Sequence, residues 1–379
     1  SDLDVYVIDG KGDEDLAQQV ASLVYRHKKV QVPIFRVGSN KRGALYNPFS
    51  GSDDAIYNRL CSLAGVHEQT GEARFYARRN MDMLQLVTNA PPGVPRSFEE
   101  VRERLDKAWL ARAYQDDPST AAEIKTMHAK GFEELQSALR PLARMFTPLT
   151  GQEGFKIEET RYAVFSLGTQ SASVTTKEFV NMLVEDIKDA MKNRIKRPCV
   201  WIIDEFLVLG NDSVRDILTI GRSFGMGVVL AMQSIDAIDD VRTKNIMLTN
   251  CRTKILMAND KPETLIEMGG TRKAYKTSIQ HEEGAATGLG TSRLEDEFLI
   301  DPNEVRALRA GECFLLRQQR AAKLKVSPVQ DIPLVPEAEL QLEKTKSQPV
   351  IATTPTPEAD RTNEDSTSSW WQNESGTQT

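Results

Sequence analysis

The chain has 379 residues and is 40% hydrophobic, which is enough to bury more than one core, so about two domains are expected. No apolar run approaches the roughly 18 residues of a membrane-spanning helix, and no signal peptide opens the chain. The formal net charge is −6, and residues 327–379, with nine acids and three bases, account for all of it. Because the remainder is balanced, any contact with nucleic acid must come from local basic residues.

Cysteine and histidine usage argues against disulfides and metal sites. The cysteines have no CxxC spacing and Cys199 falls within a predicted buried strand, so we expect reduced structural thiols. The histidines form no ligand pattern either, so no transition metal is expected. The cysteines occupy positions 61, 199, 251 and 313, and the histidines positions 27, 67, 128 and 281.

The first predicted element is an apolar strand, Asp4–Asp9, which ends in a carboxylate and leads into the turn Gly10–Asp13. The turn superficially suggests a phosphate-binding loop. It does not satisfy the motif, because Gly12 follows Lys11 where Ser or Thr is required, and Val5 occupies the position of the first glycine.

After a second predicted strand, Gln31–Val37, the hydrophobic spacing becomes helical. Helices are expected over Phe98–Ala113 and Ile124–Phe146, with a break at Pro91–Gly93. Residues 53–155 are therefore interpreted as one all-α insertion. Its basic clusters, Arg78-Arg79 and Arg102 with Arg104, are interleaved with acids and are interpreted as solvated helix faces rather than DNA contacts.

The most informative stretch is Cys199–Glu205, in which an apolar run ends in two adjacent carboxylates. Such a run is typical of a strand buried on both faces of a parallel sheet, and ligands bind at the carboxyl ends of such strands. This is the form of a Walker B strand: Asp204 would hold Mg²⁺, through water, and Glu205 would orient or deprotonate the attacking water. The alternative is that the acids only cap the following helix.

A helix over Ser213–Phe224 and a second apolar strand, Gly225–Met232, follow. Gln233 ends this strand at the same edge as the acids and could hydrogen-bond a γ-phosphate or water. Arg222 could reach a phosphate across a subunit interface as an arginine finger, or it could merely complement the helix dipole.

Beyond Asn250 we expect the sheet to continue through the strands Arg252–Met257 and Gly311–Leu316. A short helix is predicted over Lys261–Met268, and a surface loop over Ala274–Arg293. From about residue 327 the chain is rich in Pro, Ser, Thr and Glu, which predicts disorder. The adjacent Trp370 and Trp371 could anchor a partner there, or they could belong to an inert end.

The order of these motifs resembles the RecA-like motor domain of type IV coupling proteins, the TraD/TraG family, which is related to the FtsK and HerA translocases. Asp4–Asp13 is similar to the family's strand and D-x-K-G-D turn, and Asn47–Phe49 to its NP segment. Arg161–Leu167 resembles the strand before the long helix that precedes Walker B. The resemblance covers about residues 2–50 and 160–325.

The resemblance implies an α/β, RecA-like P-loop NTPase sheet, largely parallel, with an all-α insertion and a disordered tail. The expected parts are a motor domain in two pieces, 1–52 and 156–326, the insertion 53–155 and the acidic tail 327–379. It also implies ATP and Mg²⁺ as ligands, with Asp204, Glu205 and Gln233 binding them. A homo-hexamer at the cytoplasmic face of the bacterial inner membrane is expected.

The implied function is ATP-driven delivery of DNA, single-stranded and with its relaxase, or of protein to a type IV secretion channel. Relaxosome and channel proteins are the expected partners, with the tail as one contact. The family's phosphate-binding loop should lie upstream of Val5, so the chain is expected to be a fragment, inactive alone, whose missing part carries that loop and a membrane anchor.

Two other functions fit the same residues. A chromosomal DNA translocase would share the motor, although the large helical insertion and the acidic tail disfavour it. The second alternative is a scaffold protein that keeps the fold but does not hydrolyse ATP. The presence of all four candidate site residues argues against it; they are Asp204, Glu205, Arg222 and Gln233.

Overall fold

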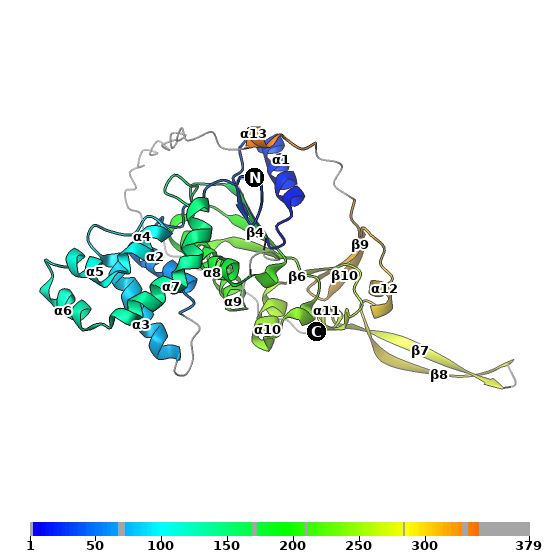
Figure 1. Ribbon diagram of the computed structural model, residues 1–379. Coiled ribbons are helices and arrows are strands. Elements are labelled where there is room, and N and C mark those ends of the chain that lie inside the picture. The colour runs from blue at the N-terminus through cyan, green and yellow to red at the C-terminus, as the bar shows by residue number, and fades with distance from the viewer. Residues whose placement is uncertain are drawn as a thin grey trace, which may run out of the picture. The chain divides into compact units, whose positions relative to one another are not determined.

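The computed structural model describes residues 3–66, 73–168, 173–208, 211–282, 285–327 and 333–340. Its centre is a five-stranded sheet, all parallel, with the strand order β2-β3-β1-β4-β5 (Figure 1). The predicted α/β class with a parallel sheet is therefore confirmed. The strands are β1 (Asp4–Asp9), β2 (Ile34–Val37), β3 (Tyr162–Leu167), β4 (Cys199–Asp204) and β5 (Met226–Leu230).

The centre of the sheet is covered on both faces, because successive side chains of a strand point to opposite sides. On one face Tyr6 of β1 stacks on Trp201 of β4, with the ring centroids 4.4 Å apart. On the other face Val7 packs with Ala17 of α1 (Glu14–Lys28). This two-sided burial explains why the central strands are continuous apolar runs.

Between β2 and β3 the described chain is helical, as the spacing predicts. One difference from the prediction is that residues 98–113 form two helices, because Asp106 accepts a hydrogen bond from the Trp109 backbone N–H and begins a new helix. The helices are α2 (Asp53–Leu63), α3 (Ala73–Asn89), α4 (Phe98–Arg104), α5 (Lys107–Ala113), α6 (Pro118–Thr126) and α7 (Ala129–Phe146).

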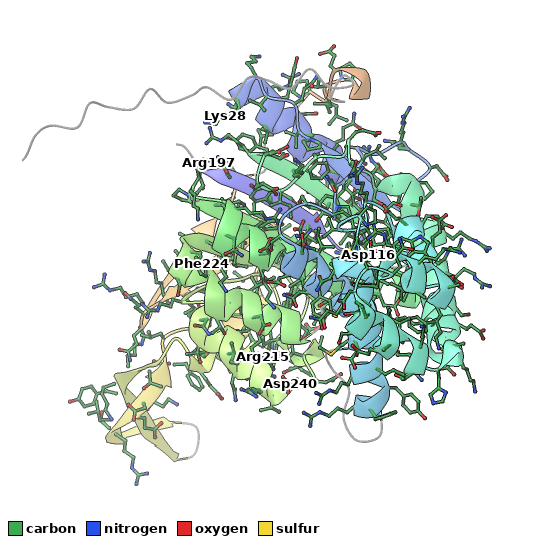
Figure 2. The ribbon with its side chains drawn as sticks, turned by 90° about the vertical axis from the view of Figure 1, so that its left-hand side faces the viewer. Lys28, Asp116, Arg197, Arg215, Phe224 and Asp240 are labelled. Carbon is green, nitrogen blue, oxygen red and sulfur yellow. The ribbon has the colours of Figure 1, made fainter. Side chains whose placement is uncertain are left out.

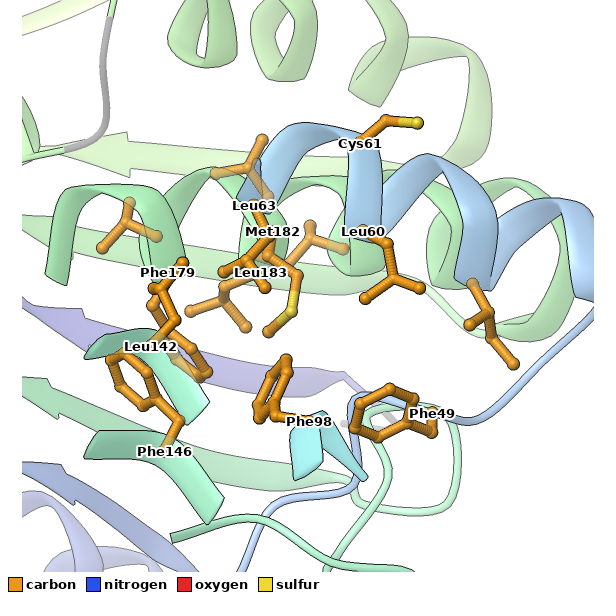
Figure 3. Packing of buried hydrophobic residues seen from close by; sticks show 14 of the residues in the cluster. Phe49, Leu60, Cys61, Leu63, Phe98, Leu142, Phe146, Phe179, Met182 and Leu183 are labelled. Carbon is orange, nitrogen blue, oxygen red and sulfur yellow. The ribbon is translucent and has the colours of Figure 1, made fainter. Parts of the chain in front are cut away.

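The helical segment and the sheet share one hydrophobic core. Phe179 of α8 (Ser173–Asp189) stacks on Phe146 of α7 at 4.1 Å and on Phe35 of β2 at 5.3 Å between ring centroids. Figure 3 shows this contact, with Leu183 of α8 beside it. Aromatic packing of this kind contributes beyond the buried area, so α8 links the two parts of the chain.

A buried cluster of charges reinforces the same junction. The fully buried Asp186 of α8 lies 3.2 Å from Arg59 of α2, and it also pairs with Arg194 and accepts a hydrogen bond from Tyr46. Arg194 contacts Asp189 at 2.9 Å as well. Each buried charge therefore has partners of opposite sign, and removal of one would leave an uncompensated charge.

The predicted strands near 252–257 and 311–316 form, but they do not continue the parallel sheet. They are β6 (Thr253–Leu256) and β9 (Glu312–Arg317), which pair antiparallel with each other, and β9 also pairs with β10 (Arg320–Lys325). Hydrophobic patterning predicted the strands but not their partners, because pairing depends on the tertiary path of the chain.

The helix α9 (Asn211–Ile220) connects β4 with β5, and α10 (Val241–Asn250) leads from β5 to β6. Figure 2 shows Arg215 of α9 close to Asp240, whose carboxylate accepts the Thr243 backbone N–H and caps α10. Hydrogen bonds from Thr243 lower the pKa of Asp240, and the Arg242 backbone hydrogen bond and the Arg215 charge add to this. The helices are α9 (Asn211–Ile220), α10 (Val241–Asn250), α11 (Glu263–Glu267) and α12 (Pro302–Arg306).

The surface loop predicted over Ala274–Arg293 is wrong, since most of this stretch belongs to a two-stranded antiparallel hairpin. Its strands are β7 (Thr271–Glu282) and β8 (Ala285–Phe298), which pair with each other only among the described strands. The stretch is too polar for an apolar strand pattern, and ion pairs between the strands help to hold it instead. These pairs are Arg272–Glu297, Lys273–Asp296 and Lys276–Glu295, at 3.3, 3.0 and 3.3 Å.

Part of the segment predicted to be disordered is folded. Residues 333–340 lie along α1 and end in the short helix α13 (Glu337–Leu340), as Figure 1 shows. The Val335 backbone N–H donates to Ser22 Oγ at 3.0 Å, and the Val335 and Leu340 side chains are buried. The folded part of the chain thus extends at least to residue 340, while residues 341–379, with Trp370 and Trp371, lie outside the described part of the chain.

A glycine in the turn after β1 allows the close approach of two strand ends. Gly12 has φ +74°, and a Cβ there would lie 2.6 Å from Gly168 Cα at the end of β3. Gly65 has a similar φ, +62°, but no described atom lies within 4 Å of its Cβ position. Gly65→Ala therefore carries only the backbone penalty, whereas Gly12→Ala adds a steric one.

We expect Gly65→Ala to lower the free energy of unfolding by about 1 kcal/mol and Gly12→Ala by about 2–4 kcal/mol. Urea denaturation of both variants measures the difference. Equal losses would contradict the contact between the two turns.

Candidate functional site

The polar ends of three neighbouring strands meet at one edge of the parallel sheet. Asp9 at the end of β1 pairs in register with Asp204 at the end of β4. On its other side Asp9 is in register with Ser166 of β3. The carboxyl edge of a parallel sheet is where ligands bind, so this is the candidate site.

Asp9 organises the turn that borders the site. Its fully buried carboxylate accepts the backbone N–H groups of Lys11 at 2.9 Å and Gly12 at 3.1 Å, and that of Asp13. Ser166 Oγ donates to it at 3.3 Å. Burial raises the pKa of Asp9, and the backbone hydrogen bonds oppose that rise. Its oxygens are thus engaged by the protein, so Asp9 has a structural role.

Lys11 and Gln233 both hold the Glu205 carboxylate. Lys11 Nζ lies 3.0 Å from Glu205 Oε1, and Gln233 Nε2 donates to the same oxygen at 2.8 Å. The Lys11 hydrogen bond is the main cause that lowers the pKa of Glu205, and the Gln233 hydrogen bond and the Lys11 charge add to it. Glu205 is therefore an ionised acceptor at neutral pH.

The backbone at Glu205 is in an unusual conformation. Its φ is +50°, in the left-handed region that residues other than glycine rarely adopt, at a cost of about 1 kcal/mol. Glu205 directly follows β4, and its side chain contacts Lys11 in the turn after β1 and Gln233, which lies beyond the end of β5. Strained residues of this kind concentrate at functional sites.

Asp204 is the carboxylate at this edge that remains available. It is partly buried and makes no hydrogen bond or ion pair through its side chain to the residues described. Within the described ranges no group of three or more His, Cys, Asp or Glu residues could hold a metal ion. A single carboxylate suits Mg²⁺, which keeps several waters and takes phosphate oxygens as further ligands.

Three of the four predicted site residues are brought together. Asp204, Glu205 and Gln233 lie at one sheet edge, although β4 and the strand before Gln233 are separated by a helix. Arg222 lies in the one-turn helix Gly221–Phe224, but its side chain is outside the described atoms. The nearby Phe224 is 37% exposed and is marked in Figure 2, which puts this end of α9 at the surface.

Sequence reasoning missed Lys11 as a member of the site. The motif around Lys11 excludes it as a phosphate-loop lysine, and no local pattern assigns it another role. Its actual partner, Glu205, is 194 residues away in sequence, and only the parallel pairing of β1 with β4 brings the two together. The sequence holds one indication of this contact, because Lys11 and Glu205 each follow a predicted strand that ends in an aspartate.

Comparison with known proteins supports the family that the motifs suggested. Residues 198–310 match the family model described as the TraM recognition site of TraD and TraG. The resemblance to the TraD/TraG coupling proteins is confirmed. None of the curated protein sequences matches the chain.

Solved structures share the fold over most of the chain. An unbound form of the bacterial conjugative coupling protein TrwB has a TM-score of 0.56 at 15% identity, over 87% of this chain and 85% of its own. TrwB in complex with ADP and Mg²⁺ has a TM-score of 0.53 at 17% identity, over 86% of each chain. VirB4 of Thermoanaerobacter pseudethanolicus has a TM-score of 0.53 at 13% identity, over 89% of this chain and 84% of its own. The RecA-like fold of the TrwB motor is therefore shared.

Removal of the Lys11 charge should raise the pKa of Glu205, because the ammonium stabilises the ionised carboxylate. Lys11→Met keeps the length of the side chain without the charge, and Lys130→Met on α7 serves as a matched control. Carboxyl-carbon NMR titration of labelled glutamates measures the shift. An unchanged pKa in Lys11→Met would show that the ion pair does not hold Glu205.

Proposed function

We propose that this chain is the motor part of a type IV coupling protein. It uses ATP to recruit DNA with its relaxase, or a protein substrate, and to deliver it to a type IV secretion or conjugation channel. The observation that carries the proposal is the pair Asp204 and Glu205 at the carboxyl end of a central parallel strand, inside the segment that matches the coupling family. The fold shared with the conjugative coupling protein TrwB supports it.

Glu205 is suited to act as the general base. The carboxylate is ionised at neutral pH, and its Oε2 makes no hydrogen bond or ion pair with the described residues, so it can accept a hydrogen bond, and then the proton, from an attacking water. Gln233, already bonded to Glu205, can orient the same water through its amide. Bound ATP would supply the phosphoryl group, and Mg²⁺ would neutralise the phosphate charge, with Asp204 as the residue that holds the ion.

The use of ATP and Mg²⁺ is also supported by the neighbours, since TrwB has been solved with ADP and Mg²⁺ and with a non-hydrolysable ATP analogue. We propose that the protein works at the cytoplasmic face of the bacterial inner membrane. Of the helices described here, none is both long and apolar enough to span a bilayer.

A relaxosome protein is the partner that the matching segment suggests, because the description of that family names TraM recognition. The hairpin β7–β8 lies within this segment. Its register partners Tyr275 and Leu294 are 75% and 51% exposed. We propose that they form part of the contact, and that the tail with Trp370 and Trp371 supplies another.

Replacement of the proposed base should separate binding from turnover. In the full-length protein, Glu205→Gln keeps the size and a hydrogen-bonding group but loses the proton acceptor, so ATP should still bind while kcat falls by about 10²–10⁴-fold. Glu159→Gln, at an exposed ion pair with Lys156, is the control. An unchanged kcat in Glu205→Gln would remove the proposed base and favour the scaffold alternative.

Arg222 tests the proposed homo-hexamer. If its guanidinium acts on the nucleotide of a neighbouring subunit, mixtures of Arg222→Ala with Glu205→Gln subunits should recover part of the ATPase activity, because some interfaces pair an intact finger with an intact base. Steady-state ATPase rates are measured across mixing ratios. Rates that never exceed those of the two parents would indicate that Arg222 acts only within its own subunit.

A further inference from the structure

The first two turns of α3 carry a surface that the motor site does not use. Arg74, Phe75, Tyr76 and Arg78, here called the α3 patch, are all exposed. Phe75 is 73% and Tyr76 55% exposed, which is unusual for two adjacent large aromatic side chains. Ala77 is the buried residue of this stretch, so the patch lies outside the core-facing stripe of the helix.

The two rings are arranged against each other and against a cation. Their centroids lie 5.8 Å apart with an interplanar angle of 82°. The guanidinium carbon of Arg79 lies 5.3 Å from the centroid of the Tyr76 ring, and its Nη2 donates to Glu134 of α7 at 2.9 Å. The ion pair therefore fixes the guanidinium that holds Tyr76.

The neighbouring helix leaves space for this arrangement. At Gly131 of α7 a Cβ would lie 3.2 Å from the guanidinium carbon of Arg79, so a larger residue would push that side chain away. Lys130 is 85% exposed in its side chain and lies 3.8 Å from Glu134. The rim of the patch thus carries further positive charge, while Glu134 is already shared by two cations.

The charges indicate what the patch contacts. Neither Arg74 nor Arg78 forms an ion pair with a residue in the described ranges, so both are available to an anionic ligand. Exposed rings flanked by guanidinium groups suit single-stranded nucleic acid, whose unstacked bases lie on aromatic faces while its phosphates pair with arginine. In a duplex the bases are already stacked on one another, so their faces are not available to the Phe75 and Tyr76 rings.

We propose that the α3 patch binds single-stranded nucleic acid, with bases stacked on Phe75 and Tyr76 and phosphates paired with Arg74 and Arg78. This rests on the proposed function with DNA as the substrate, and it locates one contact on the helical segment. It also revises the interpretation of Arg78 as a merely solvated residue, because Phe75 and Tyr76 lie three and two positions before it on α3 and both rings are exposed.

Fluorescence anisotropy with labelled oligothymidylate and the whole chain tests the site. The double variant Phe75→Ala/Tyr76→Ala should weaken binding by about tenfold or more with an unchanged salt dependence, because stacking is lost but no charge. Arg74→Gln/Arg78→Gln should also reduce the slope of log affinity against log salt by about 1.4, as two phosphate contacts are lost. Phe75→Tyr/Tyr76→Phe should bind as the unaltered chain does.

Matched controls are Leu23→Ala, an exposed apolar side chain on α1, and Arg140→Gln on α7. Thermal unfolding followed by circular dichroism checks that each variant is folded. The proposal would be overturned if the patch variants bound oligothymidylate as the controls do. It would also be overturned if they lost affinity for duplex DNA as much as for the single strand, or if they lost only the binding of relaxase.

The outcome is separable from that of the proposed function. If the chain binds oligothymidylate and the patch variants do not differ from it, the site is wrong while a coupling role stands. If Glu205→Gln leaves kcat unchanged but the patch variants lose binding, the motor assignment is wrong and the patch is supported.

Discussion

The in-register parallel pairing of β1 with β4 is the constraint on which the candidate site depends. It sets Asp9 beside Asp204 and brings the turn after β1 next to the residue after β4. The contact of Glu205 with Lys11 follows from that register, because a shift of one residue would turn the side chains of a strand to the opposite face, and the pairing of β4 with β5 brings Gln233 to the same carboxylate. The stacked rings of Tyr6 and Trp201 lie on the same two strands and favour the same register.

The buried charges around Asp186 make the helical segment part of the same body. Arg59 comes from α2, Tyr46 from the chain before it, and Asp186 from α8, the helix that precedes β4. Burial makes each charge costly without its partners, so the cluster specifies how α2 and α8 meet more than it adds stability.

Much of the fold could be read from the residues alone. The apolar run before Asp204 and Glu205 predicted β4, and the change of hydrophobic spacing after residue 53 predicted the helices, because both patterns are local and follow from one-sided or two-sided burial. The sequence also predicted that Asp204, Glu205 and Gln233 would lie at one edge, since parallel strands joined by a helix end on the same side.

The tertiary structure decided what depends on contacts between distant residues. Lys11 and Glu205 are close only because their strands are neighbours in the sheet, and no local pattern encodes which strands pair. For the same reason β6 and β9 form a separate antiparallel sheet, and the polar residues of β7 and β8 form a hairpin held in part by ion pairs across it. Val335 and Leu340 are too few to form a local pattern, yet α1 buries both, because a folded surface can order a short segment that could not order itself.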